Sequence, residues 1–482
     1  MAALEQPETV RNTDPTADVT ASAQGDFDTG WQAYERGNYE TAHAAWRPLA
    51  EQGDIIAQYN IASMYDNGRG VAEDKSEAAR WYRAAAKQGD VDAQFSLGFM
   101  YDYGDGVEQD YGEAVRWYRA AADQGLSTAQ FNLGVLYDYG EGVAEDDVEA
   151  VKWYRAAAEQ DDADAQFNLA LMYDYGDGVA LDDVEAVKWY RLAADQGLAN
   201  AQYNLALMHD YGEGVAEDDA QAAQWYQNAA DQNHAKSQYN LALMYDYGNG
   251  VVLDDGRALA LYRQAAEQQH LDAQFNLAIM YDNGEGTAED NLEAAKWYRR
   301  AAEQGHSGAQ FSLGLMYDSG AGVDMEAVKW YNKAAALDHA NSQYNLALMY
   351  DYGEGVTIDD AEAVRWYLAA AKQDHLDAQY NLALMYDEGE GTAVNDTEAV
   401  RWYLSAAELG HAAAQYNLGA MYYGGEGTMV DYPSAYMWSA VAAAQGKEEA
   451  QENIDIIAQQ MATSQISEAK ERARLWLADH DL

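Results

Sequence analysis

Residues 165–179 read AQFNLALMYDYGDGV, and close copies of this stretch recur along most of the chain. The glutamine at its second position advances by 36 residues from copy to copy, except for one step of 33. These glutamines are Gln58, Gln94, Gln130, Gln166, Gln202, Gln238, Gln274, Gln310, Gln343, Gln379 and Gln415. A period of this length indicates a solenoid, in which each supersecondary unit stacks on the next and shares one core with it.

Each unit divides into two predicted helices. The first, which we call helix A, is expected over about 93–103 in the second unit, with Ala93 and Leu97 on its apolar face. Gly104 supplies the backbone conformation that ends it. Asp110 then provides an N-cap for a second helix, helix B, which carries a Trp-Tyr pair and several alanines.

Small residues recur in register on both helices. The fifth position after the start of every copy is Ala or Gly, as at Ala206, and helix B carries a matching alanine column that includes Ala186. Small side chains let neighbouring helices approach closely, so a large residue at either position should overpack the stack.

The pattern Ala-x3-Leu-Gly/Ala-x2-Tyr-x2-Gly-x-Gly-Val, followed by Ala-x2-Trp-Tyr-x-Ala-Ala, resembles the Sel1-like repeat of the tetratricopeptide superfamily. The resemblance implies an all-α fold, a right-handed α/α superhelical solenoid of helix pairs that serves as an interaction scaffold. Bacterial members of this family are often exported, and some bind host proteins, envelope partners or cell-wall assemblies. The family has no shared catalytic residues to carry over.

The predicted organisation has four parts. Residues 1–25 are polar and unpatterned and are predicted to be a disordered tail. Residues 26–54 form a capping helix pair, residues 55–447 form eleven repeats, and residues 448–482 form C-terminal capping helices.

The charge of the chain restricts its partners. There are 82 acidic and 29 basic residues, giving a net charge of -53 and a pI near 4.1. This sign excludes phosphate-neutralising nucleic-acid binding and favours a basic protein partner. The same composition also suits a halophile, in which acidity serves solubility alone. The chain has no cysteine and therefore no thiolate chemistry.

No apolar run approaches the length of a membrane span, so membrane insertion is not expected. No signal-peptide core follows Met1. We expect a periplasmic or secreted protein if a signal peptide was removed, and a cytoplasmic one otherwise.

Acidic, glycine-turned loops raise an alternative function. Oxygen-rich loops suit Ca²⁺ or similar divalent and lanthanide-like cations, although the spacing is not that of an EF-hand. The residues that would hold such a cation are Asp138, Glu141, Asp174, Asp177, Asp210, Glu213, Asp351 and Glu354. Helix capping and a solvated acidic surface explain the same residues without a ligand, and no other cofactor is expected.

Six histidines share one repeat position just after helix B: His234, His270, His306, His339, His375 and His411. Stacked helices lie roughly 8–10 Å apart, so equivalent histidines in successive repeats cannot share a metal ion. We expect them to interact favourably with the C-terminal dipole of helix B.

The candidate binding surface combines an asparagine column with tyrosines that end helix A. Exposed tyrosines among carboxylates suit cationic ligands, whereas partly buried tyrosines would only pack. The candidates are Asn132, Asn168, Asn204, Asn240, Tyr103, Tyr139, Tyr175, Tyr211, Tyr247 and Tyr352. No catalytic motif appears, so the sequence predicts a non-enzymatic scaffold with an acidic, tyrosine-rich concave face.

Overall fold

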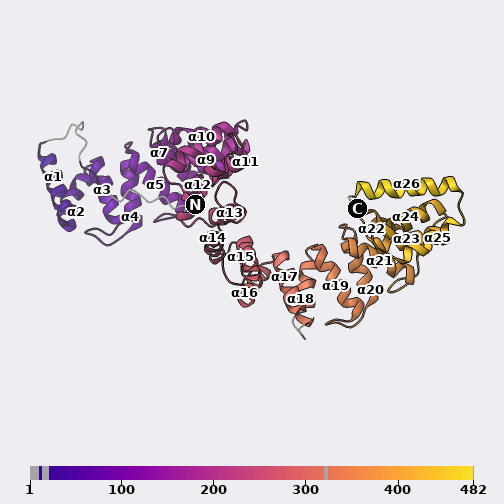
Figure 1. Cartoon of the computed structure of the whole chain (residues 1–482). Coiled ribbons are helices and arrows are strands. Elements are labelled where there is room, and N and C mark those ends of the chain that lie inside the picture. Colours follow the sequence, from indigo (N-terminus) through magenta and orange to yellow (C-terminus); the bar gives the residue numbers. More distant parts are fainter. Residues whose placement is uncertain (1–9, 13–20, 320–323, 481–482) are drawn as a thin grey trace. The chain divides into compact units, whose positions relative to one another are not determined.

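The computed structural model describes residues 10–12, 21–319 and 324–480, and these residues form 26 α-helices and no strand (Figure 1). The two helices of a repeat pack against each other, as α5 (Val91–Tyr103) does on α6 (Tyr111–Ala122), and α6 then packs on α7 (Ser127–Tyr139). The predicted all-α solenoid of helix pairs is confirmed.

Odd-numbered helices from α3 to α23 are the A helices of successive repeats. Besides α5 and α7 they are α3 (Ile55–Asp66), α9 (Ala163–Tyr175), α11 (Ala199–Tyr211), α13 (Ala235–Tyr247), α15 (Leu271–Asn283), α17 (Ser307–Asp318), α19 (Ala340–Tyr352), α21 (Leu376–Glu388) and α23 (Ala412–Gly424). The B helices besides α6 are α4 (Lys75–Ala86), α8 (Asp147–Ala158), α10 (Asp183–Asp195), α12 (Asp219–Asp231), α14 (Asp255–Glu267), α16 (Asn291–Glu303), α18 (Asp324–Ala335), α20 (Asp360–Ala371), α22 (Asp396–Glu408) and α24 (Tyr432–Ala444).

The chain forms two compact units, Met1–Leu253 and Asp254–Leu482. Each unit has its own buried core of Ala, Leu, Met, Trp and Tyr side chains from successive helices. Among the described residues, no helix is both long and apolar enough to cross a bilayer.

The predicted caps explain where the helices begin and end. Asp146 accepts a hydrogen bond from the backbone N–H of Glu149 at 3.1 Å, which satisfies a donor at the start of α8. Gly140 ends α7 with a left-handed φ of +68°. Gly142 is also left-handed, and a Cβ there would lie 2.3 Å from the carbonyl carbon of Tyr111 in the preceding repeat. The loop therefore requires glycine for two reasons, conformation and close approach.

The small-residue column brings helix A onto helix B. A Cβ on Gly134 would lie 2.8 Å from the ring of Tyr154, and Ala186 and Ala206 are fully buried. The space beside the small residue is therefore filled by the helix-B tyrosine, in agreement with the interdigitation expected of a packed core.

The repeated glutamine has a structural role. The side chain of Gln130 donates to the carbonyl of Ala122 at 3.1 Å, which joins α7 to the preceding helix B. Gln160, at the end of α8, donates in turn to Gln130 Oε1 at 2.7 Å. The same pair of bonds recurs at other repeats, so the most regular feature of the sequence is a buried polar ladder between helices.

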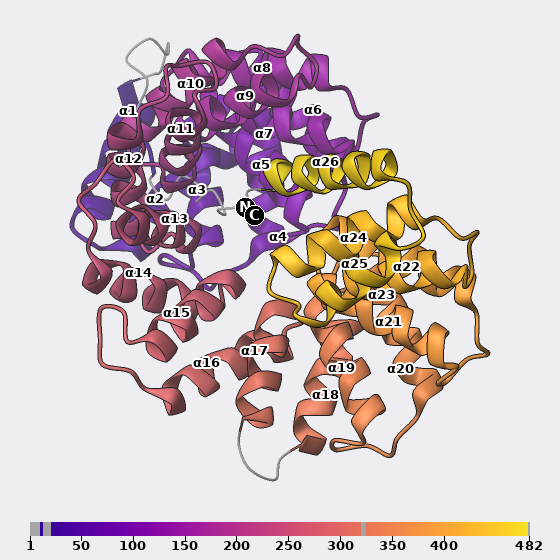
Figure 2. The ribbon, with the colours of Figure 1, turned by 45° about the vertical axis from the view of Figure 1, so that its right-hand side comes forward.

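The ends of the chain are capped by helices. At the N-terminus, α1 (Ala21–Glu35) begins inside the segment predicted as a tail and packs on α2 (Tyr39–Glu51). Most of that tail, 1–9 and 13–20, lies outside the described residues. At the C-terminus, α25 (Glu449–Ala458) and α26 (Thr463–Asp479) both pack on α24, with the rings of Trp438 and Trp476 5.7 Å apart (Figure 2).

Candidate protein-interaction surface

From α7 to α23, each helix A has one side that is not buried in the core. We call this side, and the equivalent positions of α3 and α5, the helix-A face. On α9 it carries Phe167, Asn168, Leu171 and Tyr175, which are partly or largely exposed. Leu169, on the opposite side of the helix, is buried. The spacing of these residues along the helix places them on one stripe. Equivalent residues repeat on the other A helices, so the face is a ladder of aromatic, amide and aliphatic side chains.

The tyrosines predicted for this surface are exposed. Their exposed fractions lie between 56% and 68%: Tyr103, Tyr139, Tyr175, Tyr211, Tyr247 and Tyr352. Tyr103 stacks beside Phe99 with ring centroids 4.4 Å apart, and its pKa is raised by burial and by the nearby charges of Asp102 and Glu141. These rings are available for contact with another molecule, and they are not the partly buried packing tyrosines of the alternative interpretation.

The asparagine column is half-buried and already makes contacts within the chain. Asn240 donates to the hydroxyl of Tyr226 on helix B at 3.0 Å, and Asn168 donates to the backbone carbonyl of Asp164 at 2.9 Å. Asn132 and Asn204 are half-buried in the same way and hydrogen-bond to the helix-B tyrosines Tyr118 and Tyr190. The column therefore helps to join helix A to helix B of the preceding repeat.

The candidate cation ligands separate into two groups. Asp138, Asp174, Asp210 and Asp351 are half-buried, and each accepts a hydrogen bond from the helix-B tyrosine of its own repeat, for example from Tyr154 at 2.9 Å. Glu141, Asp177, Glu213 and Glu354 lie in the loops between the two glycines, mostly exposed. Nowhere in the described parts of the chain do three or more His, Asp or Glu side chains gather where they could hold a metal ion.

Burial makes the tyrosine-bonded aspartates weaker acids than exposed aspartates. It raises the pKa of Asp138, Asp174, Asp210 and Asp351, and it raises the pKa of their counterpart Asp102 to about 6. The tyrosine hydroxyl opposes this shift because it stabilises the carboxylate. These aspartates are therefore structural acids that hold helix A against helix B.

The histidine ladder has a different role from the one predicted. His375 is the N-cap of α21, and its Nδ1 accepts a hydrogen bond from the backbone N–H of Ala378 at 3.3 Å. His234, His270, His306, His339 and His411 cap their A helices in the same way. The expected interaction with the C-terminal dipole of helix B was wrong. A neutral imidazole is a hydrogen-bond acceptor, and burial lowers the pKa of His375.

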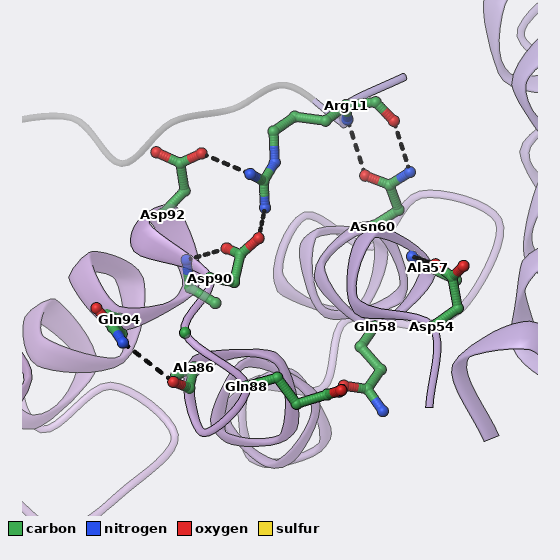
Figure 3. A network of polar contacts seen from close by, with 12 residues as sticks. Arg11, Asp54, Ala57, Gln58, Asn60, Ala86, Gln88, Asp90, Asp92 and Gln94 are labelled. Carbon is green, nitrogen blue, oxygen red and sulfur yellow. Dashed lines mark hydrogen bonds and ion pairs between the residues drawn. The ribbon is translucent and has the colours of Figure 1, made fainter. Parts of the chain in front are cut away.

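A contact that the sequence did not reveal lies at the N-terminal end of this surface. Arg11 packs against α3 and the start of α5, where its side chain meets Asp90 and Asp92 and its backbone meets Asn60 (Figure 3). Val10 beside it is 6% exposed. The only sequence signal was an apolar and a basic residue together in a polar, acidic tail.

The stacked helix pairs, the polar ladder between them and the exposed helix-A face define an all-α solenoid repeat protein. The Sel1 repeat model matches eleven consecutive segments: 55–90, 91–126, 127–162, 163–198, 199–234, 235–270, 271–306, 307–339, 340–375, 376–411 and 412–447. The chain belongs to the Sel1 repeat family, a family of protein-interaction scaffolds that are typically non-enzymatic, and the predicted family is confirmed.

One solved structure supports the same assignment. The chain is 36% identical to a protective antigen of uropathogenic Escherichia coli described as displaying an SLR fold, with a TM-score of 0.77 over 90% of this chain and 94% of that one. A Sel1 repeat protein from Oxalobacter formigenes is 32% identical, with a TM-score of 0.44 over 52% of this chain and 96% of that one.

A curated relative shares only part of its length with this chain. An exopolysaccharide production negative regulator from Rhizobium leguminosarum bv. viciae is 39% identical over 56 residues. That segment is 12% of this chain and 21% of the relative, so the chain spans about a fifth of the relative's length.

Proposed function

We propose that this protein is a bacterial, non-enzymatic scaffold that recruits a basic protein partner through its acidic, tyrosine-rich helix-A face. The observation that carries the proposal is the row of tyrosines, at least 56% exposed, that end successive A helices. A tyrosine presents a rigid aromatic surface and a hydrogen-bonding hydroxyl, the combination that is enriched where proteins bind one another.

Charge supports a basic partner. Exposed loop acids such as Asp177 and Glu213 lie a few residues from Tyr175 and Tyr211. With a net charge of -53, the chain attracts cationic proteins from a distance and repels acidic ones. This attraction speeds association and weakens as salt is added. Cation binding by the loops has no comparable support, because in the part of the chain that the structure describes no three of these carboxylates gather where they could hold a metal ion.

The test uses a random peptide library displayed on phage and selected against the full chain. We expect the selected peptides to be rich in Arg and Lys and to bind less tightly at high salt. A double variant, Tyr139→Ala with Tyr175→Ala, should weaken their binding by about tenfold or more, because buried interface tyrosines commonly contribute that much.

A matched control comes from the same two repeats. Val148 and Val184, at the starts of α8 and α10, are 65% and 64% exposed, and we expect their change to Ala to leave binding unchanged. Selection of acidic or uncharged peptides, or an equal loss in the tyrosine and valine variants, would contradict the proposed function.

A further inference from the structure

Arg11 is held by two adjacent repeats through two kinds of contact. Its backbone N–H donates to Asn60 Oδ1 at 2.8 Å, and its carbonyl accepts from Asn60 Nδ2 at 2.9 Å. These two hydrogen bonds hold the backbone of residue 11 and do not depend on its side chain. Asn60 lies on the helix-A face of α3, in the column that continues as Asn132 and Asn168.

The side chain of Arg11 makes a second, independent set of contacts. Its guanidinium contacts Asp90 at 2.6 Å and Asp92 at 2.9 Å (Figure 3). It also lies over the ring of Tyr59, 3.9 Å from the centroid. Two carboxylates and an aromatic face match the planar, multiply donating guanidinium better than they match an ammonium group. We call Tyr59, Asn60, Asp90 and Asp92 the Arg11 site.

The repeat geometry brings the equivalent residues together at later junctions. In the second unit a histidine takes the place of Asp90, and it lies against the aromatic ring that takes the place of Tyr59: His306 is 4.4 Å from Phe275 and His411 is 4.3 Å from Tyr380, centroid to centroid. In the first unit Lys236 lies over the ring of Tyr203 at 5.9 Å. A cation or an imidazole on that ring is thus a recurrent feature.

Only one later junction keeps both acids of the Arg11 site. Adding two repeats, 72 residues, to Tyr59, Asn60, Asp90 and Asp92 leads to Phe131, Asn132, Asp162 and Asp164, which we call the α7–α9 junction. At the other junctions the residue equivalent to Asp90 is not an aspartate. It is leucine at Leu126 and Leu198, then one of the six capping histidines, and finally Lys447.

The α7–α9 junction has the same framework as the Arg11 site. Asp162 caps α9 by accepting from Ala165 N–H at 2.9 Å, as Asp90 caps α5. Phe131 lies 5.8 Å from Tyr154, as Tyr59 lies 5.6 Å from Tyr82. The aromatic ring and the cap are therefore positioned alike in the two places.

The two places differ in what covers them. Tyr59 and Asn60 are 1% and 0% exposed beneath Arg11, whereas Phe131 and Asn132 are partly exposed. Within the described residues, no ion pair joins Asp162 or Asp164 to a basic side chain. Burial and the neighbouring charge of Asp164 raise the pKa of Asp162, a cost that a bound cation would relieve.

We propose that the α7–α9 junction binds an arginine carried by an extended segment of a partner protein. Asn132 hydrogen-bonds to the backbone of that segment. Asp162 and Asp164 pair with the guanidinium, and the ring of Phe131 packs against the flat face of the guanidinium. This assignment rests on the proposed scaffold function and gives it one defined ligand position. The chain's own residue 11 shows the binding chemistry at the copy of the site two repeats earlier.

The test uses a fluorescein-labelled peptide, Ala-Val-Arg-Asn-Ala with blocked ends, and the full chain. Titration followed by anisotropy and calorimetry should give one site per chain, and a peptide with citrulline in place of arginine should bind about tenfold more weakly or worse. The double variant Asp162→Asn with Asp164→Asn should show a similar loss, and it should fold because asparagine caps helices as well as aspartate does.

A change at the occupied copy supplies a gain of function. The variant Arg11→Ala removes the guanidinium contacts with Asp90, Asp92 and Tyr59 and leaves only the backbone bonds to Asn60. A peptide that brings its own arginine should then displace residue 11, so the stoichiometry should rise from one to two peptides per chain. Adding the two asparagine substitutions to Arg11→Ala should return it to one. This result does not depend on any loss of stability.

Three outcomes would overturn the proposal: equal binding of the citrulline peptide, unchanged binding by the asparagine double variant, or a dimer in light scattering that Arg11→Ala dissolves. The last would make a second copy of this chain the occupant. If library peptides still depend on Tyr139 and Tyr175 while the asparagine variant binds normally, the scaffold function stands and the arginine position fails.

Discussion

Changing Tyr154 to Phe tests whether the tyrosine–aspartate contacts hold the repeats together. The change removes one hydroxyl and leaves the fully buried ring against Phe131. The lost hydrogen bond is 2.9 Å long and ends on Asp138, which is half-buried. A hydrogen bond to a charged group contributes about 1.5–3 kcal/mol, and partial access of water to the carboxylate places the expected loss near the lower end, about 1–2 kcal/mol.

The loss should depend on pH. Burial raises the pKa of Asp138, and the Tyr154 hydroxyl partly opposes that shift. Without the hydroxyl the pKa of Asp138 rises further. A raised carboxyl pKa favours the folded state below the unfolded value of about 3.9, and this contribution is lost as the pH rises through the folded pKa. The destabilisation by Tyr154→Phe should therefore be larger at pH 7.5 than at pH 4.

Hydrogen exchange read by mass spectrometry is the suitable assay, because repeat proteins often unfold locally. Peptides from α7 and α8 should exchange faster in the variant. Tyr139→Phe is the matched control, since the Tyr139 hydroxyl belongs to an exposed side chain, and its effect should be close to zero. Equal losses at pH 4 and pH 7.5, or no loss at either, would refute the structural role of the pair.

Three further outcomes are expected. When the pH is lowered from 7 to 5, hydrogen exchange corrected for intrinsic rates should slow around Asp102, because its folded pKa of about 6 makes its ionisation destabilising. Exchange should become faster around His375, because its pKa is lowered and protonation removes a helix cap. Changes in the same direction at both places would contradict the assigned roles. Gly178→Ala should lower the free energy of unfolding in urea by more than about 3 kcal/mol, because φ is +66° and a Cβ would lie 2.3 Å from the carbonyl oxygen of Asp147. Gly125→Ala is the control: no atom lies within 4 Å of its Cβ position, so it should lose only the left-handed strain of about 1–2 kcal/mol. The melting temperature should rise with NaCl as the net charge of -53 is screened, and millimolar CaCl2 at matched ionic strength should add nothing; a clear extra rise would favour the cation-binding alternative.

Most of the fold could be predicted because its determinants are local and repeated. The caps at Asp146 and Gly140 act within a few residues of the helix ends that they define. The small-residue columns and the aromatic pairs recur every 36 residues, so one unit is enough to read the others. The pattern placed Tyr139 and Tyr175 where helix A meets its loop, but it left open whether they are exposed or partly buried, and the structure shows them exposed.

The role of a polar side chain that contacts a residue elsewhere in the chain could not be predicted from the repeat pattern. The histidine ladder was assigned to the helix before it, and the structure shows His375 capping the helix after it. Both assignments fit the same position in a linear pattern, and only the direction of the imidazole separates them. Asp138 likewise could be a cap, a cation ligand or a hydrogen-bond acceptor until Tyr154, 16 residues away, was placed beside it.

The sequence by itself determined the helix pairs, their caps, the family and the acidic net charge of the chain, because each follows from residue type and period. The tertiary structure decided which polar groups meet. Arg11 and Asn60 are 49 residues apart, and Arg11 and Asp90 are 79 apart. Stacking brings α3 and the start of α5 together, so both contact Arg11, and no linear pattern records that contact.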